Sequence, residues 1–194
     1  MSGVRGKPPG RIRIIGGSLR NSRLDVPELA GLRPTAERVR ETLFNWLAPV
    51  IDGARCLDLC AGTGALGIEA LSRGAASVQF VEREPRSAQA LRDNLARLGL
   101  GATGRVAAVD AAAFLAAAPQ PQDLVFLDPP FTLGLWSGLA RQLEQGGWLA
   151  ARAWIYVESP RGGVLELPPT WQLHREGHAG EVRFALYRRA LPLS

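Results

Sequence analysis

The sequence predicts an α/β fold: a doubly wound, mostly parallel sheet of seven strands with an antiparallel edge. Three observations support this prediction. From residue 54 onward, short apolar runs alternate with stretches of helical periodicity through five repeats. A glycine-rich turn joins the first apolar run to the first helical stretch. The last two apolar runs are separated by a short turn rather than by a helix, which is typical of an antiparallel hairpin at a sheet edge.

A short basic extension precedes the alternating region. Residues 1–10 are rich in Gly, Pro and Arg and are expected to form a flexible tail. Residues 11–24 contain two short apolar runs on either side of Gly16-Gly17. This pattern predicts a β-hairpin that turns at the glycine pair.

A helix is expected to follow the hairpin, capped by Thr35, which comes after Pro34 and is a residue type that caps helices. Apolar residues then recur at helical spacing: Val39, Leu43, Trp46 and Leu47. The opposite, exposed face of this helix is expected to show Arg38, Arg40 and Glu41.

The alternating region predicts five parallel strands with helices between them. The expected strands are 54–59, 77–82, 105–109, 124–128 and 154–158. The expected helices are 65–73, 85–98, 111–118 and 135–144. Pro85 suits a first helical turn, and Gly74 and Gly99 suit helix ends. Two further strands, 171–175 and 182–188, are joined by the turn-like GHAGE and complete the seven.

The composition is that of an ordinary globular chain. The 194 residues are 46% hydrophobic, and a chain of this length buries about 70% of its unfolded surface without disulfides. Because no apolar run reaches ~18 residues and the start lacks a hydrophobic signal segment, we expect a cytoplasmic protein with no membrane span. Cys56 and Cys60 are expected to be packing residues. We expect one structural domain, with residues 1–50 as a basic tail, hairpin and helix packed on residues 51–194.

The positive charge is concentrated near the start of the chain. The formal net charge is +5, but residues 1–40 hold nine basic and three acidic side chains, so the remaining residues are nearly neutral. Such an arm favours a polyanionic partner such as a nucleic acid. The alternative is a codon bias toward arginine, since Lys7 is the only lysine. That bias explains the choice of arginine but not its uneven placement.

The segment CLDLCAGTGALGIEAL joins the first predicted strand to its helix, and Gly62, Gly64 and Gly67 match the dinucleotide pattern GxGxxG. Asp58 favours a different cofactor. A carboxylate at the strand end repels a pyrophosphate and attracts an ammonium. S-adenosylmethionine carries an ammonium and a sulfonium but no phosphate, and therefore suits this loop. The alternative interpretation of Asp58 is a strand-end turn residue.

Two more acids follow the next predicted strands. Glu82 ends the second strand, where it can accept hydrogen bonds from both ribose hydroxyls, as the equivalent acid of NAD sites also does. Asp110 comes after the third strand. It can either bond an adenine amino group or cap the helix that follows.

The fourth predicted strand ends in Asp128-Pro129-Pro130-Phe131. The two prolines make a rigid loop at the carboxyl end of the strand, where open α/β sheets bind ligands. Asp128 offers a carboxylate, the Pro129 peptide a carbonyl, and Phe131 an aromatic face that can stack on an unstacked base. Two acceptors holding the N–H groups of an exocyclic amine would direct its lone pair toward an electrophilic methyl group. The alternative is a turn with a capping Asp.

Together these segments resemble the bacterial 16S ribosomal RNA guanine-N2 methyltransferase D family, within the class I S-adenosylmethionine-dependent methyltransferases. The similarity lies in RIIGGSLR, GLRPTAERVRETLFNWL, CLDLCAGTGALGIEALSRGA, VFLDPPF and GWLAARAWIYVES, which occur in the family's order over about residues 11–189. The resemblance implies a Rossmann-like methyltransferase domain. It also implies methylation of the 2-amino group of a guanine in small-subunit rRNA.

The resemblance implies a role for each matching position. Expected at the cofactor, S-adenosylmethionine, are Asp58, Ala61, Gly62, Thr63, Gly64, Glu82, Arg83, Asp110 and Ala111. Expected at the target amine are Asp128, Pro129, Pro130 and Phe131. Expected to contact RNA or close over the cofactor are Arg11, Arg13, Arg20, Arg23, Arg33, Thr35, Arg38 and Arg40. The implied partner is 16S rRNA or a partly assembled small ribosomal subunit, and we expect a monomer with no metal and no membrane contact.

Several alternatives stay open at this point. A related loop beginning with Asn is usual in protein glutamine methylation, and adenine-N6 methylation of DNA uses similar chemistry. A non-catalytic RNA-binding assembly factor is a further alternative, and an NAD oxidoreductase is opposed by Asp58. His174 and His178 are not expected to bind a metal, because they fall in a strand and a turn. Trp136 is a candidate wall of the target pocket.

Overall fold

The computed structural model describes residues 10–30, 32 and 34–191, so the predicted tail over 1–10 lies almost wholly outside the described residues. A two-stranded hairpin, β1 (Gly10–Arg13) and β2 (Arg23–Val26), precedes the main sheet. The strands of that sheet are β3 (Arg55–Asp58), β4 (Ser77–Val81), β5 (Gly104–Ala107), β6 (Gln122–Leu127), β7 (Leu149–Pro160), β8 (Trp171–Ala179) and β9 (Val182–Arg189). The helices are α1 (Glu37–Leu47), α2 (Ala65–Ser72), α3 (Pro85–Arg97), α4 (Ala111–Leu115) and α5 (Trp136–Gln145), with a 3-10 turn η1 (Phe131–Leu133).

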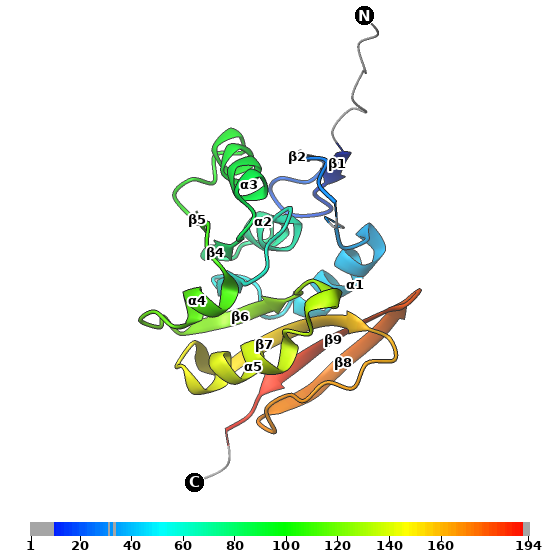
Figure 1. Cartoon of the computed structure of the whole chain (residues 1–194). Coiled ribbons are helices and arrows are strands. Elements are labelled where there is room, and N and C mark those ends of the chain that lie inside the picture. Colours follow the sequence, from blue (N-terminus) through cyan, green and yellow to red (C-terminus); the bar gives the residue numbers. More distant parts are fainter. Residues whose placement is uncertain (1–9, 31, 33, 192–194) are drawn as a thin grey trace, which may run out of the picture.

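The main sheet has seven strands in the order β5-β4-β3-β6-β7-β9-β8. The first five are parallel, whereas β9 runs antiparallel to both β7 and β8 (Figure 1). The predicted fold class, including the antiparallel C-terminal hairpin, is confirmed. β7 is longer than predicted, because it begins at Leu149 and extends beyond Glu158.

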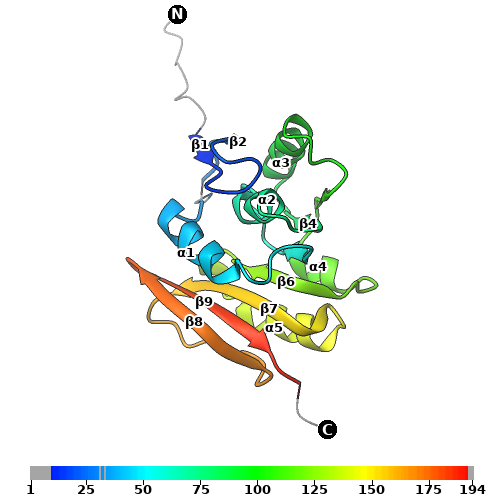
Figure 2. The same cartoon turned by 180° about the vertical axis from the view of Figure 1, so that it is seen from behind.

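The sheet separates two hydrophobic layers. Helices α1, α2 and α3 pack on one face, against β-strand residues such as Cys56, Phe80 and Phe126. Helices α4 and α5 pack on the other face, against the alternate residues of the same strands, such as Leu57 and Val125 (Figures 1 and 2). This alternation explains why the central strands read as continuous apolar runs: both faces of each are buried.

The hairpin exists, but its predicted tight turn at Gly16-Gly17 is wrong. The strands lie further apart in sequence, at 10–13 and 23–26, and pair with Gly10 opposite Val26. The intervening loop is held by its own backbone hydrogen bonds, such as those between Ile14 and residues 21 and 22, and also by α2. Glu69 accepts from the backbone N–H groups of Ile15 (3.0 Å) and Gly16 (2.9 Å), and Ser72 Oγ accepts from Leu19 N (2.9 Å).

Two expectations for the first helix are also wrong. Thr35 does not cap it: Ala36 is the N-cap residue, and the Thr35 hydroxyl points to acidic residues at the sheet edge instead. Arg40, expected on the exposed face, is only 2% exposed. Its guanidinium lies 3.5 Å from the buried Glu69 carboxylate and donates to the Arg13 and Thr35 carbonyls, so the helix turns this cation inward.

Candidate functional site

Four carboxylates gather at one edge of the sheet, where parallel strands end. Asp58 ends β3, Glu82 follows β4, Asp128 follows β6 and Glu158 lies near the end of β7. These strands are neighbours in the order β4-β3-β6-β7, so the four acids lie along one continuous edge. In open α/β sheets this is the edge that binds ligands.

The loop between β3 and α2 has a backbone that only glycine accepts readily. Gly62 (φ 54°) and Gly64 (φ 78°) lie in the left-handed region. A Cβ on Gly64 would lie 2.2 Å from Leu91 Cδ1, whereas one on Gly62 would meet only Leu32, at 3.4 Å. The space beside the Cα of Gly62 is therefore open to a ligand, while Gly64 lets α3 pack closely against the loop.

Asp58 lies beneath this loop and is 2% exposed. Its Oδ2 accepts from the backbone N–H of Gly67, at 3.1 Å, which anchors the first turn of α2. Burial raises the pKa of Asp58 to about 7, and the nearby Glu82 carboxylate adds to that rise, while the Gly67 hydrogen bond opposes it. Asp58 is thus poised to ionise near neutral pH when a cation approaches.

Glu82 joins the glycine loop to the next helix. Its carboxylate accepts from Gly62 N (2.7 Å) and from Glu84 N (2.8 Å). These two backbone N–H groups hold the half-buried Glu82 carboxylate beside the glycine loop. Arg83, the next residue, is exposed.

Asp110 shows the geometry of a helix cap. Its Oδ2 accepts from Ala112 N (3.1 Å) and Ala113 N (3.3 Å) at the start of α4, where Ala111 is the first helical residue. Of the two interpretations weighed from sequence, the cap is the one with observed contacts. Asp110 remains exposed and lies at the same sheet edge, so its proposed contact with an adenine stays a prediction.

The DPPF segment forms the rigid loop after β6. Pro129 is buried, whereas Phe131 is 38% exposed and packs its ring 5.6 Å from that of Trp136. Trp136 is buried and donates from Nε1 to the Glu158 carbonyl, at 2.9 Å. Trp136 therefore packs against Phe131, and the Phe131 ring remains partly exposed to solvent.

Glu158 is the residue of this site that the sequence analysis missed. It is 8% exposed, and its Oε2 accepts from the hydroxyls of Thr35 (3.0 Å) and Tyr156 (2.9 Å). A signal was present in the sequence, because Glu158 follows the apolar run AWIYV just as Asp58, Glu82 and Asp128 follow theirs. Asp58, Glu82 and Asp128 could be predicted as site residues because they belong to recognisable motifs.

Asp128 and Glu158 form a coupled carboxylate pair. The strands pair Leu127 with Val157, so the next residue of each strand lies side by side. The Thr35 hydroxyl lies between them, 3.4 Å from Asp128 Oδ2. Burial raises the pKa of both carboxyls, and the charge of Glu158 raises that of Asp128 further. Two adjacent buried carboxylates do not both ionise readily, so this pair tends to share a proton.

The predicted RNA-contacting residues divide into two groups. Arg11, Arg13, Arg20, Arg23 and Arg38 are exposed. Arg11 pairs with Asp25 at 3.6 Å and Arg13 with Glu37, so part of that charge is offset locally. Arg40 is buried in its contact with Glu69, which corrects its assignment as an RNA contact. Thr35 is also buried, and Arg33 lies outside the described residues.

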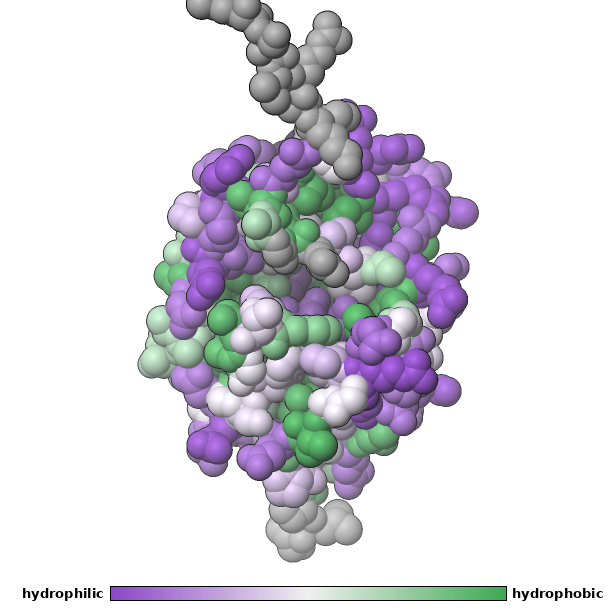
Figure 3. Space-filling view, turned by 45° about the vertical axis from the view of Figure 1, so that its right-hand side comes forward, coloured by the Kyte–Doolittle hydropathy of each residue, from purple (hydrophilic) through white to green (hydrophobic). Residues whose placement is uncertain are grey.

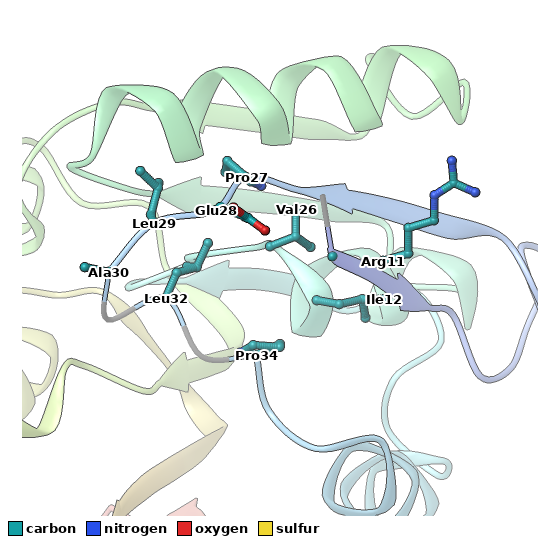
Figure 4. Close-up of a pocket in the computed structure, with 10 residues that line it drawn as sticks. Arg11, Ile12, Val26, Pro27, Glu28, Leu29, Ala30, Leu32 and Pro34 are labelled. Carbon is teal, nitrogen blue, oxygen red and sulfur yellow. The ribbon is translucent and has the colours of Figure 1, made fainter. Parts of the chain in front are cut away.

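A groove of ≈ 540 Å³ lies between the hairpin and the segment that leads to α1. Figure 4 shows Arg11 and Ile12 on the hairpin side, and Leu29, Leu32 and Pro34 on the opposite side. A neighbouring groove of ≈ 420 Å³ continues toward Thr35. Together they run from the basic hairpin to Thr35, whose hydroxyl contacts Asp128 and Glu158. In the space-filling view, hydrophilic residues (purple) gather at the margins of one face of the molecule (Figure 3).

The described residues contain neither a metal-binding cluster nor a membrane-spanning helix. No group of three or more His, Cys, Asp or Glu side chains within them is arranged to hold a metal ion. None of the described helices is both long and apolar enough to cross a membrane.

Comparison with known proteins places this fold and site in context. The family model described as Conserved hypothetical protein 95 matches residues 12–188. The chain is 52% identical over 181 residues to the ribosomal RNA small subunit methyltransferase D of Escherichia coli (strain K12), covering 93% of this chain and 91% of that protein. It is 41% identical to the Haemophilus influenzae protein of the same name, covering 92% and 94%. A solved Escherichia coli structure described as a candidate methyltransferase superposes with a TM-score of 0.87 at 50% identity, covering 93% of this chain and 99% of that chain.

Proposed function

The chain belongs to the Conserved hypothetical protein 95 family, and from that membership we propose that it is an rRNA methyltransferase that transfers a methyl group from S-adenosylmethionine to the exocyclic 2-amino group of a guanine in 16S rRNA. Relatives that match nearly the whole chain are named ribosomal RNA small subunit methyltransferase D, which supports the enzyme class and the rRNA substrate. The DPPF loop supports an exocyclic amine as the target, and the resemblance of the sequence motifs to the guanine-N2 methyltransferase D family is the reason for choosing the 2-amino group of guanine. The proposed substrate of the enzyme is bare 16S rRNA or a partly assembled small subunit. We further propose that the enzyme is a cytoplasmic monomer.

The residues at the sheet edge fit a cationic cofactor without phosphate. The carboxylates of Asp58 and Glu82 flank the glycine loop, and the space beside the Cα of Gly62 is free for a ligand. A pyrophosphate would be repelled by these charges, whereas an ammonium and a sulfonium are attracted. When bound, S-adenosylmethionine supplies the electrophilic methyl group. Asp58 and the peptides from Ala61 to Gly64 would hold its methionine end, Glu82 and Arg83 its ribose, and Asp110 and Ala111 its adenine.

The DPPF loop is the single observation that carries the proposed reaction. Asp128 and the Pro129 carbonyl hold two acceptors at the end of β6, and Phe131 offers an exposed ring for the target base. Holding both N–H groups of the amine orients its lone pair, and the loop does so without moving because two prolines fix its backbone. The neighbouring carboxylate pair then provides a place for the proton that the amine releases.

RNA is proposed to approach over the extension of residues 1–50, which packs on the catalytic part of residues 51–194. Arg11, Arg13 and Arg23 of the hairpin line the grooves that run toward Thr35. Arginines at such positions hold phosphates and fix the register of the RNA, while the pocket at the sheet edge receives the unstacked base.

The proposal is tested by transfer of a labelled methyl group to 16S rRNA and to small subunits from cells lacking the enzyme. Wild-type protein is expected to label one of these substrates. Asp128→Ala should lower kcat by about 100-fold or more, because an acceptor for the amine is lost, whereas Asp128→Asn keeps an acceptor oxygen and should lower kcat less. Both variants should still bind S-adenosylmethionine in calorimetry. An Asp128→Ala protein as active as wild type would overturn the mechanism.

A further inference from the structure

Glu158 enters the proposed reaction so far only as half of the carboxylate pair with Asp128, yet several groups hold its side chain. Two hydroxyls donate to the same oxygen, Oε2: Thr35 from the segment before α1, at 3.0 Å, and Tyr156 from β7, at 2.9 Å. The Asp128 carboxyl also lies within hydrogen-bonding reach of the Glu158 carboxyl. No N–H group and no Ser, Thr or Tyr hydroxyl among the described residues donates to Oε1, so this oxygen is left to Asp128 or to a ligand.

The Glu158 carboxylate belongs to the same site as Asp128. The pairing of Leu127 with Val157 puts Asp128 and Glu158 next to each other at the ends of adjacent strands. The Thr35 hydroxyl, 3.0 Å from Glu158 and 3.4 Å from Asp128, confirms that the two carboxylates face a common point. A group held by Asp128 thus has Glu158 as its immediate neighbour.

The chemistry of guanine matches two neighbouring acceptors. On its Watson–Crick edge guanine presents N1–H beside the 2-amino group, so two donors lie side by side. Adenine presents an unprotonated N1 there and has no 2-amino group. An ionised carboxylate only accepts hydrogen bonds. With Asp128 at the 2-amino group, the adjacent carboxylate meets the N1 position.

We propose that Glu158 selects guanine by accepting the N1–H of the target base at Oε1, while Thr35 and Tyr156 hold the carboxylate in place. This inference rests on the proposed function and adds the residue that reads the base. The hydroxyls serve two purposes. They fix the rotamer of the side chain, and they lower the pKa of Glu158 against the rise from burial. The proton that the pair shares is therefore held on Asp128, which still accepts through its other oxygen, and Glu158 remains an acceptor. An unprotonated N1 would place two acceptors in contact, which a site built for a donor rejects strongly.

The test compares guanosine with 2-aminopurine at the target position of an rRNA fragment, once the methylated guanine has been mapped with wild-type enzyme. 2-Aminopurine keeps the amino group but has an unprotonated N1. Wild type is expected to prefer guanosine by at least about 100-fold in kcat/KM. In Glu158→Gln the amide can donate to the unprotonated N1, so the preference should shrink by about 10-fold or more.

Two further variants separate recognition from structure. Tyr156→Phe leaves Oε1 intact and should keep the preference for guanosine, even if overall activity falls. Glu158→Asp withdraws the carboxylate and should lose activity on guanosine without gaining it on 2-aminopurine; it also serves if Glu158→Gln does not fold. Binding of S-adenosylmethionine, measured by calorimetry, should be unchanged in each folded variant.

The outcomes are distinct. If both Glu158 variants lower kcat/KM equally for the two bases, or leave the preference at its wild-type value, Glu158 is structural and the inference is overturned. If the wild-type enzyme labels no guanine amine at all, the proposed function fails instead, before the variants are compared.

Discussion

Asp58 connects the stability of the protein to pH. Its pKa is raised from the ordinary 3.8 to about 7 by burial, so between these values the native protein keeps a proton that the unfolded chain has released. Stability conferred by this group is therefore present at low pH and is lost as pH rises toward 7.

Replacing Asp58 with Asn tests this sign. The amide oxygen still accepts from Gly67 N but does not titrate, so the variant should gain stability relative to wild type as pH rises. Between pH 5 and pH 8 the gain should be about 2–3 kcal/mol. Urea unfolding of both proteins at the two pH values measures it. A difference that is the same at pH 5 and pH 8 would contradict the assignment of the raised pKa to Asp58.

At the scale of single residues, the sequence located acids well and hydroxyls poorly. Asp58, Glu82 and Asp128 were identifiable because each ends an apolar strand and belongs to a motif. Thr35 was misassigned, since a Thr before a helix is usually a cap, and only the tertiary structure shows that its hydroxyl bonds Glu158 across 123 residues of sequence. Arg40 was misassigned because its buried partner, Glu69, lies on another helix, and no local pattern links the two residues.

At the scale of elements, the glycine loop depends on the absence of side chains at particular positions. Gly64 combines a φ of 78° with a close approach of Leu91, whereas Gly53 has a φ of 71° and nothing within 4 Å of where a Cβ would lie. The two glycines thus share a backbone conformation but differ in their surroundings.

Gly64→Ala and Gly53→Ala form a matched pair. Gly53→Ala should cost about 1 kcal/mol for the left-handed backbone alone. Gly64→Ala adds a steric overlap and should cost about 2–4 kcal/mol, with loss of S-adenosylmethionine binding as the loop shifts. Thermal unfolding and calorimetry on both variants give the comparison. Equal costs and intact binding in Gly64→Ala would show that the loop tolerates a side chain there.

One buried acid, Glu69, links both the hairpin loop and α1 to α2. Glu69 accepts from the backbone of residues 15 and 16 and from Arg73 at 2.9 Å, and it lies 3.5 Å from Arg40. Sequence patterns could not predict this link, because a Glu within an apolar helix gives no indication of its partners. The predicted turn at the glycine pair failed for a related reason, since contacts with α2 help to set the shape of the loop.

Removing that acid should loosen the extension. Glu69→Ala leaves Arg40 buried without an opposite charge close by, which should cost about 3–5 kcal/mol. Asp123→Asn, which breaks the exposed ion pair with Arg55, is the control and should be nearly neutral. Urea unfolding measures both, and limited proteolysis should cut Glu69→Ala first within residues 10–36. An unaltered stability in Glu69→Ala would contradict the role of this network.

At the scale of the whole molecule, the layered fold was predictable because local signals agree with one another. The strands are apolar on both faces, the helices are bounded by glycine and proline, and the order of elements allows one sheet topology. The position of the basic extension was not predictable, since it depends on contacts with α2 and α3 that are distant in sequence.

The uneven charge predicts how RNA binding responds to salt. Point substitutions test this better than a deletion of residues 1–23, because the deletion would also remove the core residues Ile12 and Ile14. Replacing Arg11, Arg20 and Arg23 with Gln keeps the core and removes three exposed cations. Affinity for 16S rRNA should fall, and the slope of log K against log salt should become shallower by about two to three. Filter binding over a salt series measures both quantities.

Arg141→Gln is the control for that experiment, since Arg141 is an exposed cation on α5, which covers the other face of the sheet. It should leave the affinity and the slope unchanged. The same slope in the triple variant as in wild type would mean that the hairpin arginines make no phosphate contacts.

The central claim is that this protein methylates the 2-amino group of a guanine in 16S rRNA. Its most direct test is to incubate the protein with methyl-labelled S-adenosylmethionine and 16S rRNA or small subunits from a strain lacking the enzyme, digest the RNA to nucleosides, and identify the labelled one. The account predicts that all label is in N2-methylguanosine and that Asp128→Ala abolishes it. Label in methyladenosine, or label only in protein, would contradict the account.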